Sequence, residues 1–442
     1  MSETIFALAS GLGGGVAVMR VSGPRSRSSL QVLAPGAYLP RRAQLKRLVR
    51  PDSRETLDEA LVLFFEGPRS YTGEDVVEYH LHGGRAVIEG MIEFLSGQPG
   101  HRLAEPGEFT RRAFENGRMD LTEAEAVADL VAAETQAQKD QALLQMGGAL
   151  YDLYRGWAER LSKLLAHVEA DIEFPDEDMP EGVSPQAYTD VEAIRHEILN
   201  HLNDNRRGER LRGGVQVVIV GAPNAGKSSL VNALAQRDVA ITSDIAGTTR
   251  DVIEVHLDLG GYPVVLADTA GLRPDQIGHS GQEGLESEGI RRAIARAESA
   301  DIVVLLFDGT TAIPDPHTLA LIDERSLLVT NKMDFGGARN QIDSALPVSV
   351  RTGVGLEAFL GALVDKIKAL VIDRSAPCPT RPRHRRYLED TIEALERALD
   401  ARLPEMMAED LRLSVRALGR ITGKVDVEDL LDVIFRDFCI GK

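Results

Sequence analysis

The stretch VVIVGAPNAGKSSL, residues 217–230, constrains the fold of this chain more than any other. It places the pattern Gly-x-x-x-x-Gly-Lys-Ser after an apolar strand-like run and before a helical one, which is the context that a P-loop requires. In a P-loop, backbone N–H groups and the N-terminus of the following helix hold phosphate oxygens. Lys227 then reaches the outer phosphates, and the hydroxyl of Ser228 ligates Mg²⁺. A glycine-rich turn with an incidental lysine is disfavoured by this context, so we predict a nucleotide-binding loop.

The region around this loop, about 213–373, alternates strand-like and helical runs. The strand-like runs are nearly continuous in apolar residues and end in loops: VQVVIVG, YPVVLADTAG, ADIVVLLFDG, RSLLVTNKMD and ALPVSV. Such runs are typical of a mostly parallel sheet that is buried on both faces. We therefore predict an α/β domain with the nucleotide loop at the end of one of its strands.

Three further motifs after strand ends indicate GTP rather than ATP. In DTAG, residues 268–271, the aspartate can hold Mg²⁺ through water and Gly271 can donate its N–H to the γ-phosphate. In TNKMD, the carboxylate of Asp334 can accept two N–H bonds from a guanine edge, a pattern that adenine does not offer. Ser-Val-Arg at 349–351 replaces the usual Ser-Ala-Lys, and its backbone can still contact the guanine oxygen. Together the motifs predict GTP-binding residues Asn224, Ala225, Gly226, Lys227, Ser228, Ser229, Ser243, Asp244, Ile245, Ala246, Gly247, Thr248, Thr249, Asp268, Thr269, Ala270, Gly271, Asn331, Lys332, Met333, Asp334, Ser349, Val350 and Arg351.

The switch segment AITSDIAGTTRDVI leaves the hydrolytic groups partly open. Thr249 can ligate Mg²⁺ and sense the γ-phosphate. Arg250 can act as an arginine finger, but an Arg followed by Asp251 is more often a structural ion pair. Leu272 follows the DTAG motif, and its apolar side chain cannot orient the attacking water, so another group must do so. Candidates for that role in the next segment are Glu283, Glu286 and Glu288.

Helical periodicity lies on both sides of the α/β region. A long amphipathic helix is predicted from the three- and four-residue spacing of Leu150, Leu153, Trp157, Leu161, Leu164, Val168 and Ile172. The pattern recurs, after an acidic Pro-rich loop, in Val191, Ile194, Ile198 and Leu202, and again in Leu388, Ile392, Leu395 and Leu399. We expect an N-terminal α/β or α+β domain at 1–117, a helical domain at 118–212 and 374–442, and the α/β module at 213–373 inserted into it.

Composition limits the class of protein and its partners. A chain of 442 residues predicts two to four domains. The net charge of −18 argues against this chain alone gripping nucleic acid, although a local basic patch can lie within an acidic total. No apolar run reaches about 18 residues, and the first residues lack the pattern of a signal peptide. Two cysteines far apart in sequence are typical of a reducing compartment, so we expect a cytoplasmic protein with no membrane segment.

The whole set of motifs resembles the family of bacterial tRNA-modification GTPases that act with a flavoprotein partner on wobble uridine, and their mitochondrial relatives. The resemblance covers essentially the full chain. It is carried by GAPNAGKSSL, TSDIAGTTRD, DTAGLR, NKMD, SYTGEDVVE, HGG, AEPGEFTRRAFENGRMDLTEAEAVADL, ADIEFPDEDMP and FCIGK. The resemblance implies an N-terminal domain that dimerises and binds a tetrahydrofolate, a helical domain, and a Ras-like G domain inserted into the helical one.

The resemblance also implies K⁺-activated hydrolysis, in which the ion stabilises transition-state charge where an arginine finger would lie. The implied K⁺ ligands are Asn224, Ser243, Ile245 and Thr248. The family's water-activating glutamate lies three residues before a Gly-Ile pair, and that spacing from Gly289 selects Glu286. The loop before it looks several residues longer than is usual, so Glu283 and Glu288 stay as alternatives.

In the N-terminal domain, the resemblance implies folate contacts at Arg20, Glu78 and Arg118, the last being a lysine in many members. The alternative for these residues is a set of surface ion pairs. His80 and His82, in YHLHGG, alternate along a predicted strand, and without a third ligand they do not indicate a metal site.

The last five residues, FCIGK, place Cys439 where a prenylation site would lie. Gly441 and Lys442 do not fit that signal, and the acidic residues before it would be repelled by an anionic leaflet. In the family this tail lies beside the folate, so we expect Lys442 to contact it and leave the role of Cys439 undecided. A frayed end is the alternative.

We therefore predict a K⁺- and Mg²⁺-dependent GTP hydrolase. With its partner it would add a carboxymethylaminomethyl or aminomethyl group at C5 of the wobble uridine, U34, using a tetrahydrofolate one-carbon unit. The chain would be a homodimer, and the partner would bring FAD, NADH and most contact with tRNA. One rival is a ribosome-assembly or translation GTPase, which usually carries a basic RNA-binding module. Another is a stand-alone folate enzyme, which would need its own redox cofactor site.

Overall fold

The computed structural model describes residues 3–173, 185–237, 240, 254–267, 295–336, 342–371, 376–425, 427–436 and 438–442. The chain divides into two compact units. Unit 1 contains residues 1–128, 145–188 and 393–442, and unit 2 contains residues 129–144 and 189–392. Each unit is therefore assembled from segments that lie far apart in sequence, and each is described by itself below.

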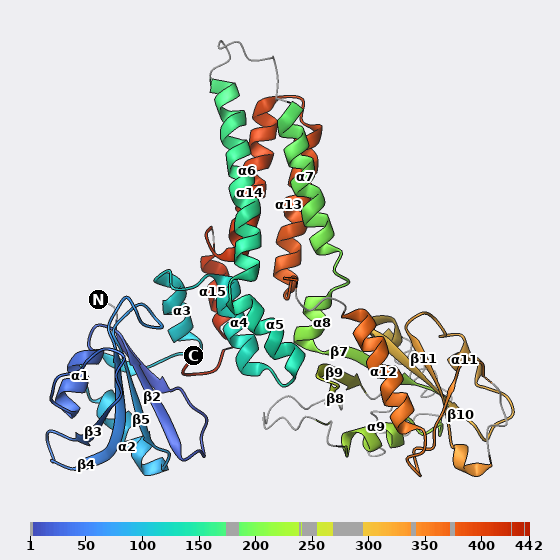
Figure 1. Ribbon diagram of the computed structural model, residues 1–442, viewed down its shortest axis with the longest axis horizontal. Coiled ribbons are helices and arrows are strands. Elements are labelled where there is room, and N and C mark those ends of the chain that lie inside the picture. Colours follow the sequence, from blue (N-terminus) through green and yellow to red (C-terminus); the bar gives the residue numbers. More distant parts are fainter. Residues whose placement is uncertain are drawn as a thin grey trace, which may run out of the picture. The chain divides into compact units, whose positions relative to one another are not determined.

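Unit 1 begins with a six-stranded sheet in the order β3-β4-β5-β2-β1-β6 (Figure 1). All neighbouring strands are antiparallel except β1 and β6. In β5, Val77, Tyr79 and Leu81 are buried, while the residues between them face the other side of the sheet. This alternation is the period of a strand with one face on the core. The strands are β1 Thr4–Leu8, β2 Val16–Ser22, β3 Gln44–Val49, β4 Thr56–Phe65, β5 Val76–His82 and β6 His101–Leu103.

Helices α1 and α2 supply the side chains that cover the buried face of this sheet. Leu30 and Leu33 from α1 and Met91 and Leu95 from α2 belong to the same core cluster as Tyr79. The helices of the N-terminal part are α1 Ser26–Leu33, α2 Arg85–Ser96, α3 Glu108–Glu115, α4 Leu121–Ala132 and α5 Gln136–Met146; the end of α4 and most of α5 lie in unit 2.

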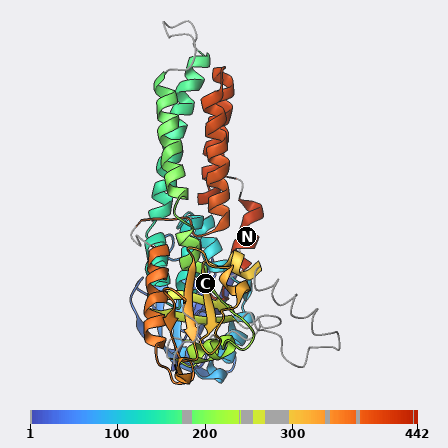
Figure 2. The same ribbon diagram turned by 90° about the vertical axis from the view of Figure 1, so that its right-hand side faces the viewer.

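The long helix expected from periodicity is α6, Ala149–Glu173, and it packs along α14, Pro404–Thr422 (Figure 2). Leu150, Trp157, Leu161 and Val168 are buried as expected, but the fully buried position between Leu150 and Trp157 is Tyr154 rather than Leu153. A helix turn of 3.6 residues allows either position to face the core, and the large ring fills the space. The remaining helices of the helical regions are α7 Pro185–Leu202, α13 Pro382–Asp400 and α15 Glu428–Arg436.

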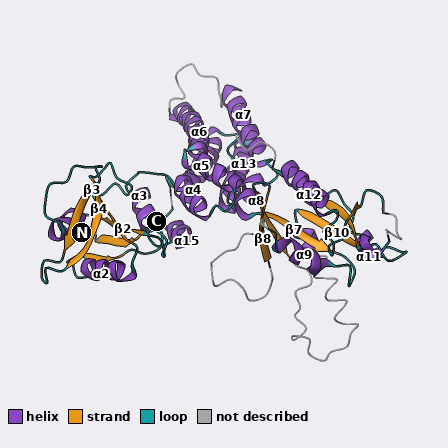
Figure 3. Cartoon of the chain, turned by 60° about the horizontal axis from the view of Figure 1, so that its bottom comes forward, coloured by secondary structure: helices purple, strands orange, loops and turns teal. Residues whose placement is uncertain are grey.

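Unit 2 contains the second six-stranded sheet, in the order β12-β11-β10-β7-β9-β8 (Figure 3). Its strand pairs are parallel except β8 with β9, which are antiparallel. The sequence patterns did not predict β8. The strands are β7 Val215–Val220, β8 Glu254–Leu259, β9 Tyr262–Ala267, β10 Ile302–Asp308, β11 Ser326–Asn331 and β12 Leu346–Pro347. The helical elements around them are α8 Arg207–Gly213, α9 Lys227–Ala235, α11 Pro316–Leu319, the 3-10 turn η2 Met333–Phe335 and α12 Leu356–Leu370.

Both faces of this sheet are buried, which explains its nearly continuous apolar strands. In β10, Val304 and Leu306 pack in the cluster that contains side chains of α9 and α12. Leu305 and Phe307 point the other way, into a cluster with the helical residues 295–299 and with Leu319 of α11. The predicted fold class is confirmed: an N-terminal domain, a helical domain, and a mostly parallel sheet inserted between helical segments. The structure places the sheet's carboxyl edge where the nucleotide motifs occur.

No helix in the described part of the chain is both long enough and apolar enough to cross a membrane.

Candidate functional site

The loop between β7 and α9 has the backbone of a phosphate-binding loop. Asn224 and Gly226 adopt positive φ angles of 64° and 102°. A Cβ at Gly221 would fall 2.3 Å from the carbonyl oxygen of Leu306, so the loop passes too close to β10 for any other residue. Lys227 begins α9, and its Nζ donates to the carbonyls of Gly221 at 2.9 Å and Ala222 at 3.0 Å. The ammonium is thereby held over the loop, where a phosphate can replace the carbonyls.

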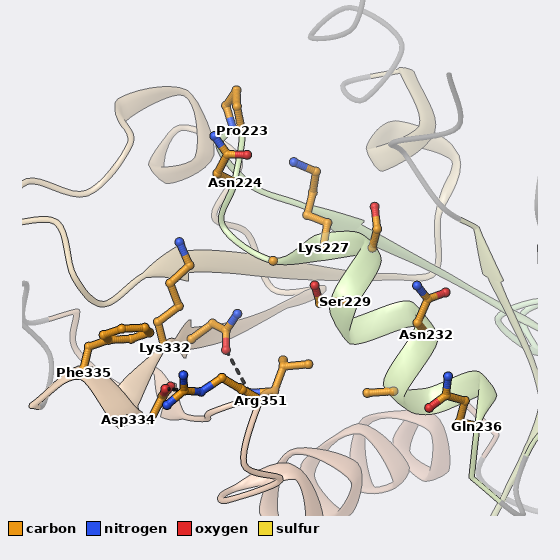
Figure 4. A pocket seen from close by; sticks show the side chains of 15 residues that line it. Pro223, Asn224, Lys227, Ser229, Asn232, Gln236, Lys332, Asp334, Phe335 and Arg351 are labelled. Atoms are coloured by element: carbon orange, nitrogen blue, oxygen red, sulfur yellow. Dashed lines mark hydrogen bonds and ion pairs between the residues drawn. The ribbon is translucent and has the colours of Figure 1, made fainter. Parts of the chain in front are cut away.

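Asn331 joins this loop to the next two strand ends. Its side-chain nitrogen donates to the carbonyl of Ala225 at 2.8 Å, and its side-chain oxygen accepts from the N–H of Val350 at 3.1 Å, the dashed line in Figure 4. A Cβ at Gly226 would lie 2.3 Å from the same amide nitrogen. One amide side chain, that of Asn331, therefore links the phosphate-loop segment, the end of β11 and the segment at Val350.

Asp334 lies at the base end with both carboxylate oxygens engaged (Figure 4). The hydroxyl of Ser349 donates to Oδ1 at 2.8 Å, and Nε of Arg351 pairs with Oδ2 at 2.9 Å. The hydrogen bond from Ser349, together with the charge of Arg351, lowers the pKa of Asp334 below its usual range. The carboxylate is ionised at neutral pH, which is the state that accepts N–H bonds.

Lys332 is oriented by an ion pair with Asp308 at the end of β10, at 2.6 Å. Burial raises the pKa of Asp308, but hydrogen bonds from Lys332 and Thr310 outweigh it and lower that pKa overall. Lys332 has φ of 63°, and its stem stands beside Phe335 in Figure 4. The ion pair therefore links the loop that carries Lys332 to the end of the neighbouring strand β10.

The phosphate end and the base end line one cavity of about 940 Å³, within the range of small-molecule sites. Phe335 was missed by the sequence patterns. Its ring is 61% exposed, and the guanidinium of Arg351 lies 5.3 Å from its centre. Ala225 is buried behind the loop, and Ser349 is buried behind Asp334. The lining residues are Pro223, Asn224, Gly226, Lys227, Ser228, Ser229, Asn232, Ala233, Gln236, Asn331, Lys332, Asp334, Phe335, Val350 and Arg351.

Several predicted site residues lie outside the described residues. They are Ser243, Asp244, Ile245, Ala246, Gly247, Thr248, Thr249, Asp268, Thr269, Ala270, Gly271 and Glu286, with the alternatives Arg250, Glu283 and Glu288. The predictions for Mg²⁺, K⁺ and the attacking water therefore have only Ser228 and Asn224 within the described structure.

Unit 1 holds the second candidate site. Arg20 on β2 and Glu78 on β5 are register partners across the sheet, and their side chains form an ion pair at 2.9 Å. The Arg20 guanidinium also lies 5.2 Å from the ring centre of Tyr71 and 5.6 Å from that of Phe109. Aromatic rings hold a cation without neutralising it, so the pair sits in a defined orientation.

The C-terminal tail docks onto this site. The carbonyl of Gly441 accepts from Nη1 of Arg20 at 3.4 Å, and the carbonyl of Cys439 accepts from the N–H of Gly107 at 3.4 Å. Gly441 has φ of 94°, and a Cβ there would lie 2.3 Å from the carbonyl oxygen of Leu8. The tail is therefore not a frayed end in this structure. The thiol of Cys439 is exposed, and Lys442 is half-buried.

Arg118 is the predicted folate residue that lies apart from these contacts. Its side chain is exposed and lies against Gly73, where an added Cβ would approach its Cγ to 3.3 Å. His82 pairs with Asp58 at 2.7 Å rather than with another histidine. Within the described ranges, no three or more His, Cys, Asp or Glu side chains are grouped as metal ligands.

Two family models match the chain. The one described as "GTP-binding protein TrmE N-terminus" matches residues 4–118, and the one described as "MnmE helical domain" matches residues 121–439. A relative from Parvibaculum lavamentivorans, named tRNA modification GTPase MnmE, is 53% identical and aligns over 100% of both chains. A relative of the same name from Rhodospirillum rubrum is 51% identical over 100% of this chain and 99% of its own. A relative from Danio rerio, named 5-taurinomethyluridine-tRNA synthase subunit GTPB3, mitochondrial, is 46% identical over 100% of this chain and 93% of its own.

Proposed function

The chain belongs to the MnmE family of tRNA modification GTPases, and from that premise we propose that it hydrolyses GTP while modifying tRNA. The observation that carries the proposal is the single cavity that joins Lys227 at one end to Asp334 at the other. Lys227 and the loop N–H groups suit the phosphates, and the ionised carboxylate suits the N–H edge of guanine. Asn331 links the two ends because it forms a hydrogen bond with each of them.

For hydrolysis we propose that Ser228 and Thr249 hold Mg²⁺, and that Asn224, Ser243, Ile245 and Thr248 hold K⁺. Both residues that lie within the described structure offer oxygen donors at the lining of the cavity, which is the donor type that these hard cations prefer. The bound cations would neutralise charge that develops on the phosphate oxygens. Glu286 would orient and deprotonate the attacking water, with Glu283 and Glu288 as alternatives.

The modification itself is proposed at C5 of the wobble uridine, U34, where a carboxymethylaminomethyl or aminomethyl group would be added. A tetrahydrofolate derivative would supply the one-carbon unit from the site in unit 1. The cations Arg20, Arg118 and Lys442 suit a polyglutamyl tail, and Glu78 suits the N–H edge of a pterin. Cys439 is exposed beside this site, and its role stays undecided.

The proposed assembly is a homodimer that acts with a flavoprotein carrying FAD and NADH, in the cytoplasm. The proposed division of the chain is an N-terminal folate-binding and dimerisation domain at 1–117, a helical domain at 118–212 and 374–442, and a Ras-like G domain at 213–373. The names of the relatives support the tRNA-modifying activity, and the cation, folate and partner assignments extend it.

The deciding experiment compares tRNA nucleosides from a deletion strain with those from the strain complemented by this chain. We expect the deletion to lose the wobble modification, the wild-type chain to restore it, and Lys227→Ala to fail because phosphates are no longer held. Lys163→Ala, an exposed lysine on α6, is the matched control and should restore it fully. A deletion strain with a normal nucleoside profile would reject the tRNA-modifying function and favour a ribosome-assembly or translation GTPase.

The K⁺ proposal has its own test. GTP hydrolysis is measured in KCl and in NaCl at equal ionic strength, and we expect a clearly higher rate in KCl. Equal rates in the two salts would remove the K⁺ site while leaving the GTPase assignment in place.

A further inference from the structure

A basic segment of the N-terminal domain stands out in a chain with a net charge of −18. Between residues 24 and 54 the sequence has a single carboxylate, Asp52, and its cations are Arg25, Arg27, Arg41, Arg42, Lys46, Arg47, Arg50 and Arg54. All of this segment lies in unit 1 and in the described part of the chain. The fold decides which of these cations gather and which are neutralised.

Part of the segment is neutralised locally. Arg50 forms an ion pair with Glu93 at 2.5 Å, and the negative charges of Asp52 and Glu55 also favour its charged form. Arg47 has Glu59 as its register partner on β4, so a carboxylate lies directly opposite on the same face. Arg47 and Arg50 therefore face carboxylates, and neither contributes to the inference.

The other half forms a basic corner, which we define as Arg27, Arg41, Arg42, Lys46 and Arg69. It lies where β3, the edge strand of the sheet, begins and β4 ends. The N–H of Arg41 donates to the carbonyl of Phe64 at 2.8 Å, and its Nη2 donates to the carbonyl of Arg69 at 2.7 Å. These two hydrogen bonds join the segment just before β3 to the end of β4 and to the loop that follows it.

Neutral groups contact three cations of the basic corner, Arg27, Arg41 and Lys46. Lys46 Nζ lies 5.0 Å from the ring centre of Tyr38, and the Arg27 guanidinium lies 5.3 Å from that of Phe64. Of the five, Arg27 has a carboxylate nearby, the exposed Glu66 at 3.9 Å. For the other four, the described residues contain no carboxylate within ion-pair distance. Among these four, neutral groups therefore orient the charges of Arg41 and Lys46 without cancelling them.

A hollow of about 310 Å³ lies in the corner, lined by Pro40, Arg41, Glu66, Gly67, Pro68 and Arg69. Two arginines at its wall offer planar forks that match the oxygens of a phosphate. Such charge at a strand edge also discourages pairing with other strands. That protective role needs neither the hollow nor arginines gathered from three separate segments.

We propose that the basic corner binds the phosphate backbone of tRNA. The proposal rests on the proposed function, because tRNA modification brings that polyanion to a chain whose total charge repels it. The corner offers charge and forks but no exposed aromatic face, since Tyr38 is 8% exposed. We therefore expect contacts that depend on salt and not on base sequence.

The test measures binding of a fluorescent wobble-uridine tRNA transcript to the full-length chain across a salt series. The variant is the triple substitution Arg42→Gln, Lys46→Gln and Arg69→Gln. Each lost phosphate contact should lower the slope of log affinity against log salt by about 0.9, so affinity near 0.1 M salt should fall on the order of 100-fold. GTP hydrolysis without tRNA should be unchanged.

The control removes three charges elsewhere: Arg85→Gln, Arg195→Gln and Arg412→Gln, each paired with an exposed glutamate. It has the same net charge as the variant and should keep the wild-type salt slope. An equal loss in both proteins, or a wild-type slope in the variant, would overturn the proposal. Normal tRNA binding with loss of the flavoprotein complex would make the corner a protein interface and also overturn it.

Nucleoside analysis separates this proposal from the proposed function. If the wild-type chain fails to restore the wobble modification in the deletion strain, the function itself is wrong. If the wild-type chain restores it and the triple variant binds tRNA normally, only the basic corner is wrong.

Discussion

The two candidate sites are assembled in different ways. In unit 2, the polar groups follow the ends of neighbouring strands in a mostly parallel sheet, so short motifs in the chain meet at one edge. In unit 1, Arg20 and Glu78 meet through antiparallel register, and Gly441 arrives from the far end of the chain. The site in unit 2 is therefore built from short loops at the ends of parallel strands. The site in unit 1 is built from pairings between segments that are distant in sequence.

The largest expected effect tests the local character of the nucleotide site. Asp334→Asn removes the charge that accepts the guanine N–H bonds, and we expect GDP affinity to fall on the order of 100-fold. Asp365→Asn, at an exposed position on α12, is the matched control and should bind as wild type. Titration of a fluorescent GDP analogue measures both. Unchanged affinity in the Asp334 variant would show that the base is read elsewhere.

The next effect tests the long-range character of the site in unit 1. Gly441→Ala places a Cβ 2.3 Å from the Leu8 carbonyl at a φ of 94°, so the tail should lift from Arg20. We expect 5-formyltetrahydrofolate to bind on the order of 10-fold more weakly by calorimetry, with GTP hydrolysis unchanged. Gly156→Ala, where an added Cβ meets nothing within 4 Å, is the control. Equal folate affinity in both variants would separate the tail from the site.

Acid should affect the two units in opposite directions. Burial lowers the pKa of His201 in unit 2 to about 4, so the folded state holds a neutral ring that the unfolded state protonates below about 6.5. That contribution to stability is complete above pH 6.5 and is lost as the pH falls toward 4, by about 3 kcal/mol. Burial raises the pKa of Asp120 in unit 1 to about 7, so its folded form takes up a proton first and gains stability between pH 7 and 4.

Amide hydrogen exchange at pH 7 and pH 5, corrected for intrinsic rates, measures this difference. We expect protection to fall in unit 2 and to hold or rise in unit 1. His201→Gln should remove most of the acid loss in unit 2. Parallel changes in both units would mean that other groups dominate their response to pH.

The smallest expected effect concerns Arg351, which occupies Oδ2 of Asp334 where guanine would donate. Its side chain is 72% exposed, so the ion pair is weak and Arg351→Ala should raise GDP affinity only about 2- to 5-fold. Arg351→Lys keeps the charge, so its GDP affinity should lie between that of the wild-type chain and that of Arg351→Ala. The GDP release rate measures the change, and faster release from the alanine variant would mean that Arg351 helps to hold the base.

The sequence patterns predicted most of the residues that line the cavity in unit 2, because their types are set by local chemistry. Gly226 adopts a positive φ, and Asp334 lies in the short turn η2 that follows strand β11, so both positions favour residue types that a sequence motif can show. The sequence patterns did not predict Phe335 as a lining residue, because an exposed aromatic residue after the motif looks like an ordinary surface residue. The sequence patterns also missed the burial of Tyr154 in place of Leu153, and they missed the antiparallel strand β8. Both features depend on the residues that pack against them.

The sequence by itself determined the fold class, and it predicted the phosphate loop and the motif that we propose reads guanine, because periodicity and strand-end loops are properties of short segments. The tertiary structure decided which distant residues meet. Only the register of β2 with β5 pairs Arg20 with Glu78, and only the docked tail brings the Gly441 carbonyl to that pair. The tertiary structure likewise decided that Arg41 and Arg69 lie in one corner. The hydrogen bond from the Arg41 side chain to the Arg69 carbonyl joins residues that are distant in sequence, so it forms only when the chain folds.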